Sequence, residues 1–146
     1  MLDTITASDV SHVIQLSVAP VFLLAGIGSI LGVMANRLAR VLDRARSFES
    51  RLATAEAGAQ ADLRARLGTL AKRARLISFG LALCTLTALL VCAVIITLFV
   101  GAFFSFSAAI PAALLFITAL MSFSGALIVF LRENFLATSS LRIGPH

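Results

Sequence analysis

Residues 76–131 carry no charged side chain, and this uninterrupted stretch limits the possible folds more than any other feature of the chain. As a single helix it would be about 84 Å long, far more than the ~30 Å hydrocarbon thickness of a bilayer. The stretch must therefore fold back once. The best break lies at residues 101–111, where glycine, serine and phenylalanine interrupt the aliphatic pattern and Pro111 suits the first turn of a new helix. We expect spans over residues 77–100 and 110–131, joined by a turn over 101–109.

A further apolar segment lies nearer the N-terminus. Residues 13–35 contain no charge and are long enough to cross a bilayer with some tilt. With 60% hydrophobic and 13% charged residues, the composition is that of a membrane protein. The preceding residues, 1–12, are acidic rather than basic, which argues against a cleaved signal peptide. The sequence predicts an all-α integral membrane protein with three transmembrane helices.

The basic residues predict the orientation of these spans. Most of the 12 lysines and arginines lie in the connection over residues 36–76, and two more follow the third span. By the positive-inside rule, this connection and the tail over 132–146 are cytoplasmic, whereas residues 1–12 and the turn at 101–109 are external. The basic residues alternate with acidic ones and have few aromatic neighbours. We therefore expect them to contact anionic lipid headgroups and not nucleic acid.

The basic connection shows a heptad pattern of apolar residues, with charged residues on its other faces. No glycine or proline lies between Ala35 and Ala57. Span one (residues 13–35) should therefore continue into the cytoplasm as one helix, turn at Gly58 and return into span two (residues 77–100), which precedes span three (residues 110–131). Spans one and two would then extend into a cytoplasmic antiparallel helical hairpin. Its expected apolar seam contains Leu38, Val41, Phe48, Leu52, Leu63, Leu67 and Leu70.

Arginines are concentrated directly after span one, at Arg37, Arg40, Arg44 and Arg46. Guanidinium groups at this place suit lipid phosphates or an acidic protein partner. Asp43 lies among them and suits an ion pair with an arginine across a helix or subunit boundary. The preferred interpretation is a solvated charged face with local ion pairs.

Small and polar residues mark faces of the spans. Ala25, Gly28, Gly32 and Ala35 share one face of span one, and such a face lets two backbones approach closely in lipid, within the chain or between copies. A polar stripe that could line a pore comprises Gln15, Thr118, Ser122 and Arg132. Ordinary packing of helices uses the same residue types and is the preferred interpretation.

Residues with catalytic or metal-binding chemistry are few. Cys84 and Cys92 are about 12 Å apart along one helix and cannot bridge each other. The chain has only two histidines, too few for a metal site from one copy, and no hydrolase or nucleotide-binding motif is present. We expect no enzymatic activity, no cofactor and no metal.

Two segments in this order carry a resemblance: APVFLLAGIGSIL at residues 19–31 and NRLARVLDRAR at residues 36–46, followed by the basic connection and two further spans. Together they resemble the bacterial membrane-protein family called domain of unknown function 2721, over nearly the whole chain. The resemblance implies a small prokaryotic integral membrane protein. We expect it in the bacterial inner (cytoplasmic) membrane. It supplies no activity, substrate or catalytic residue.

Two classes of function follow from these features. The first is a homo-oligomer with a channel-like or pore-lining assembly, in which the hairpins form a basic cytoplasmic vestibule. The second is a membrane adaptor, scaffold or accessory subunit that docks a protein partner through the heptad hairpin. Membrane lipids are expected partners in both classes, and a second copy of the chain is the expected protein partner in the first.

Overall fold

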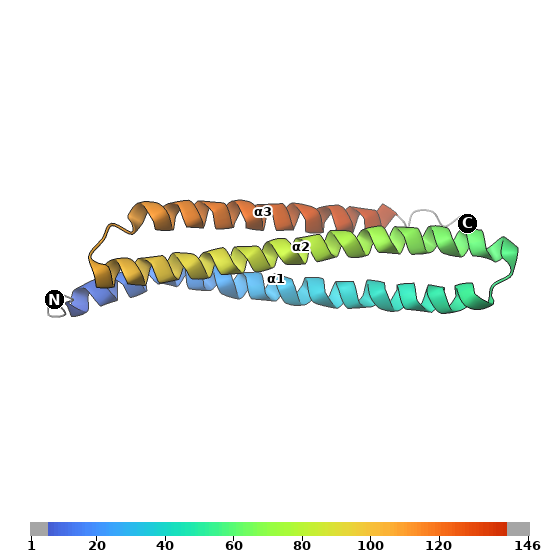
Figure 1. Ribbon diagram of the computed structural model, residues 1–146, viewed down its shortest axis with the longest axis horizontal. Coiled ribbons are helices and arrows are strands. Elements are labelled where there is room, and N and C mark those ends of the chain that lie inside the picture. The colour runs from blue at the N-terminus through green and yellow to red at the C-terminus, as the bar shows by residue number, and fades with distance from the viewer. Residues whose placement is uncertain (1–5, 140–146) are drawn as a thin grey trace. The chain divides into compact units, whose positions relative to one another are not determined.

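The computed structural model describes residues 6–139, which form three α-helices (Figure 1). They are α1 (Ala7–Thr54), α2 (Ala57–Phe104) and α3 (Ala109–Ser139). Each is long and apolar enough to cross a membrane. The predicted all-α class with three span-length apolar helices is thereby confirmed.

A capping arrangement begins α1. The Thr6 hydroxyl and its backbone N–H donate to Asp9 Oδ2 at 2.7 and 3.1 Å, and the Asp9 N–H donates to the Thr6 carbonyl at 3.0 Å. This reciprocal bonding satisfies groups that a helix start leaves without partners. The hydrogen bonds from Thr6 hold the pKa of the Asp9 carboxyl below its ordinary value, so a negative charge stays at the positive end of the helix.

The connection between α1 and α2 is shorter than expected. Only Ala55 and Glu56 separate the two helices, and Gly58 lies in the first turn of α2, so the predicted turn at Gly58 is wrong. The Gln60 side-chain amide donates to the Ala55 carbonyl at 3.2 Å, and the Ala59 N–H donates to the Glu56 carbonyl at 3.0 Å. These bonds satisfy the helix ends without the conformational freedom of a glycine.

The described residues form two compact units, each with segments of all three helices. The first contains residues 6–30 and 83–124. Its buried polar side chains, Ser17 and Thr87, donate to carbonyls one turn back in their own helices, at 2.9 and 2.8 Å, which satisfies both hydroxyls in apolar surroundings. Its apolar core contains Val13, Ile27, Cys84, Val91, Val94, Ala112 and Ala119.

The second unit contains residues 31–82 and 125–139. Met34, Ile77 and Ala126, one from each helix, are almost completely buried. Gly80 leaves room for Met34, because a Cβ at Gly80 would lie 2.4 Å from Met34 Cε. Of the seven residues predicted for the hairpin seam, Val41 and Leu70 are buried and the other five are half-buried.

The connection between α2 and α3 belongs to the first unit. Helix α2 continues through Gly101 to Phe104, so the break comes later than the start of the expected turn. Ser105 has a positive φ of 54°, which turns the chain back. A Cβ on Gly101 would lie 2.3 Å from the Cβ of Ala108, so the returning chain passes close against α2 at this glycine. Pro111 falls in the first turn of α3.

Large apolar side chains are exposed on every helix, for example Phe22 at 75%, Phe104 at 77% and Met121 at 70%. Such continuous apolar exposure is unfavourable in water and is what a helix facing lipid requires. The surface and the three apolar helices agree with a multi-pass membrane protein.

Candidate functional site

Glu133 joins the three helices of the second unit. Its side chain on α3 is completely buried. Arg73 of α2 donates from Nε and Nη2 to its Oε1, at 3.2 and 3.0 Å. From α1, Arg37 Nη2 lies 2.8 Å from its Oε2. We call Arg37, Arg73 and Glu133 the ion cluster.

The two arginines hold the carboxylate in different ways. Arg73 makes two hydrogen bonds to one oxygen, whereas Arg37 approaches Oε2 as an ion pair without a hydrogen bond aligned to this oxygen. Arg37 Nη1 donates instead to Asn134 Oδ1, and its guanidinium carbon lies 5.2 Å from the centre of the Phe130 ring. Arg37 therefore contacts α3 through charge, a hydrogen bond and a cation–π interaction.

The ion cluster lies where the three apolar segments end. Arg37 follows the apolar residues 13–35, Arg73 precedes span two, and Glu133 follows span three. Charged groups taken out of water at such a level need partners, because a buried unpaired charge costs several kcal/mol. The pairing therefore joins three helix segments of the second unit that are distant in sequence.

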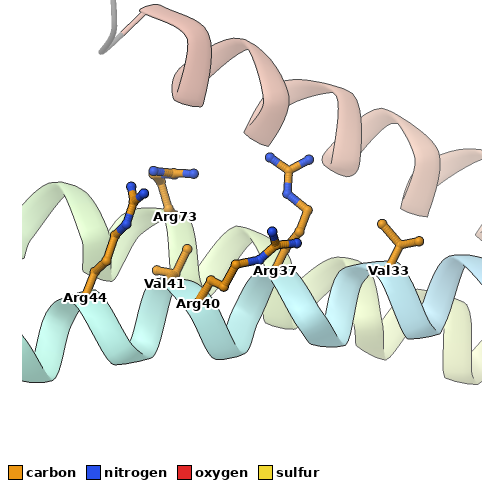
Figure 2. Close-up of a pocket in the computed structure, with 6 residues that line it drawn as sticks. All are labelled: Val33, Arg37, Arg40, Val41, Arg44 and Arg73. Atoms are coloured by element: carbon orange, nitrogen blue, oxygen red, sulfur yellow. The ribbon is translucent and has the colours of Figure 1, made fainter.

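A cavity of about 410 Å³ adjoins the ion cluster (Figure 2). We call it the arginine cavity, and it is lined by Val33, Arg37, Arg40, Val41, Arg44 and Arg73. In Figure 2, Arg37, Arg44 and Arg73 point toward the same side, the side of α3. Arg40 donates to the Asn36 carbonyl at 3.4 Å. Within residues 6–139, neither Arg40 nor Arg44 has an ion-pair partner, so the cavity is strongly positive.

A second cavity, of about 550 Å³, shares Arg44 and Arg73 with the first. Arg51 and Arg66 also line it. Arg66 is paired with Asp62 at 3.0 Å, and the Arg51 guanidinium lies 6.0 Å from the centre of the Phe48 ring. The basic surface thus continues along the paired arms of α1 and α2.

Of the four arginines grouped after span one in the sequence analysis, three line the cavity and one does not. Arg37, Arg40 and Arg44 line the arginine cavity, while Arg46 is exposed and is not among its lining residues. Asp43 is also exposed, and it makes no ion pair with any described residue.

The four residues of the predicted polar stripe differ in their exposure. Ser122 is half-buried and donates to the Leu83 carbonyl of α2 at 3.2 Å. Thr118 is exposed and donates to the Leu114 carbonyl of its own helix at 2.8 Å. Gln15 and Arg132 are exposed. Ser122 therefore serves packing between α2 and α3 and does not share an exposed face with the others.

The small residues of span one have few neighbours in the chain. Ala25, Gly28, Gly32 and Ala35 are all exposed, and nothing lies within 4 Å of the place where a Cβ would stand at either glycine. We call these four residues the small face of α1.

Sequence reasoning missed Glu133 and the role of Arg73. Glu133 stands just beyond an apolar span and resembles an ordinary charged tail residue. The available signal was the position of each residue relative to the predicted membrane boundary. Arg37, Arg73 and Glu133 all stand within a few residues of a span end on the same predicted side. Among the described residues there is no group of three or more His, Cys, Asp or Glu side chains that could hold a metal.

Comparisons with known proteins give one match. No curated protein and no solved structure matches the chain. A family model described as "Protein of unknown function (DUF2721)" matches residues 17–143, a range that includes the ion cluster and the arginine cavity. Because the match covers most of the chain and agrees with the resemblance seen in the sequence, the protein belongs to the DUF2721 family.

Proposed function

We propose that this protein is a non-enzymatic, self-associating protein of the bacterial inner membrane whose copies meet along the small face of α1. The exposure of this face carries the proposal, since neither Gly28 nor Gly32 has a neighbour within 4 Å of its Cβ position. In lipid, helices associate by close packing, and small residues give the closest approach. Association would bring several arginine cavities together into a positively charged cytoplasmic vestibule.

The test of self-association is substitution of the small face. Changing Gly28 and Gly32 together to Ile should raise the dissociation constant of the oligomer in detergent at least tenfold, equivalent to about 1.4 kcal/mol, because the branched side chains hold the backbones apart. Light scattering during size-exclusion chromatography measures the change.

Gly26→Ile is the matched control. Gly26 has equally open surroundings, but it lies on another face of α1, so this variant should assemble as the wild type does. A monomeric wild-type protein, or equal effects of the two substitutions, would contradict the proposal.

The orientation in the membrane is a second part of the proposal, with the α1–α2 connection and the C-terminus in the cytoplasm. It is supported by the concentration of basic residues in that connection. In a background with Cys84 and Cys92 changed to Ala, Ser105→Cys should react with a membrane-impermeant maleimide on spheroplasts. Gln60→Cys should react only in inverted vesicles. The reverse pattern would show the opposite orientation.

A channel and an adaptor remain the two candidate roles of the assembly. The bond from Ser122 to the Leu83 carbonyl favours the adaptor, because it removes one polar group from the stripe that would line a pore. Ion flux from liposomes that hold the purified oligomer separates the two roles. Vesicles without ion flux would support an adaptor or scaffold that docks an acidic partner at the basic surface of α1 and α2. Selective flux would support the pore.

A further inference from the structure

The arginine cavity combines excess positive charge with a partly apolar lining. Four arginines face it, and the carboxylate of Glu133 binds two of them. The positive charges of Arg40 and Arg44 are not compensated by an ion pair with a carboxylate among residues 6–139. Guanidinium groups bind phosphate oxygens through paired, charge-assisted hydrogen bonds, so a phosphate group is the anion that this arrangement suits best.

The depth of the cavity indicates where this phosphate comes from. Along α1, Arg37 and Arg40 stand about 3 and 8 Å beyond residue 35, the end of the apolar stretch. The headgroup region occupies about 5 to 8 Å outside the hydrocarbon core of each leaflet. The long side chain of Arg44 can reach back toward the same region. These arginines therefore lie at the level of lipid phosphates.

The apolar part of the lining also favours a lipid over a free phosphate. Val33 stands at the membrane end of the cavity, within the apolar stretch, and its side chain is half exposed. A free phosphate gains nothing from such a wall, whereas the glycerol and acyl portion of a phospholipid can pack against it.

We propose that the arginine cavity binds the headgroup phosphate of an anionic phospholipid. Arg40 and Arg44 make its principal contacts, and Arg37 and Arg73 are shared with Glu133. Glu133 is a positioning residue, since it fixes two guanidinium groups before the lipid arrives and reduces the ordering cost of binding. The inference goes beyond self-association, because each copy carries a complete cavity.

The experiment titrates the full-length protein in a neutral detergent with phosphatidylglycerol and follows binding by native mass spectrometry. Phosphatidylcholine and inorganic phosphate are the comparison ligands. Wild-type protein should prefer phosphatidylglycerol to both by about tenfold or more. The double variant Arg40→Gln with Arg44→Gln should lose about tenfold in affinity for phosphatidylglycerol. Its fold should persist, because among residues 6–139 these side chains make no hydrogen bond or ion pair with another helix.

The matched control is Arg46→Gln with Arg64→Gln, which removes the same charge from exposed residues that do not line the cavity. Its affinity for phosphatidylglycerol should stay within about twofold of the wild type, since exposed charges contribute little. Equal losses in the two double variants would overturn the site in favour of diffuse attraction. Inorganic phosphate that binds as tightly as phosphatidylglycerol would overturn the assignment to a lipid.

Discussion

Glu133→Gln should lower the free energy of unfolding by about 3 kcal/mol or more. The substitution keeps the size of the side chain and removes its charge. Arg37 and Arg73, whose side chains are only 22% and 14% exposed, then lose their counterion. Burying an unpaired guanidinium is costly, so the three helices of the second unit should separate more easily. Thermal unfolding of the detergent-purified protein, followed by circular dichroism, should show a fall in Tm of about 10 °C.

Arg132→Gln is the matched control for this prediction. It changes the neighbouring residue on α3, which is charged but exposed, and should alter stability by less than about 0.5 kcal/mol. A triple variant with Arg37→Met, Arg73→Met and Glu133→Leu should recover much of the loss, because no unpaired charge remains. If Glu133→Gln were as stable as Arg132→Gln, the carboxylate would not hold the helices together.

The parts of the fold that the sequence predicted are those with local signals. A span is recognised by its own apolar length, and the seam containing Val41 and Leu70 is recognised by its own heptad spacing. The position of the α1–α2 turn could not be predicted in this way. It depends on side-chain and backbone bonds around Glu56 and Gln60, which compete with the preference of Gly58 for turns.

In the arginine cavity, too, some residues could be predicted from local sequence spacing and others could not. Arg37, Arg40 and Arg44 are spaced by three and four residues, so they share a face of α1 and could be grouped from sequence. Arg46 is two residues beyond Arg44 and therefore lies on a different face.

Arg73 reaches the cavity from another helix, and Glu133 contacts Arg37 and Arg73, which are distant from it in sequence. These pairings depend on the rotation and depth of each helix, which no local pattern specifies.

Gly101→Ala should destabilise the protein by about 1 to 3 kcal/mol, because it overpacks the contact between α2 and the chain that returns into α3. The new Cβ would lie 2.3 Å from the Cβ of Ala108, with the Ala108 Cα at 3.5 Å and the Phe106 carbonyl oxygen at 3.4 Å. None of these atoms is the end of a flexible side chain. The backbone of the connection must therefore move, and Tm measured in detergent should fall.

Gly68→Ala, the matched control, should change stability in the opposite direction. Gly68 also lies inside α2, but nothing stands within 4 Å of its Cβ position. Alanine should therefore add about 0.5 to 1 kcal/mol through its higher helix propensity. The stability of Gly80→Ala should lie between those of Gly101→Ala and Gly68→Ala, because the new Cβ would meet Met34 Cε, the end of a flexible side chain. A Gly101→Ala protein as stable as Gly68→Ala would show that the connection does not approach α2 at this glycine.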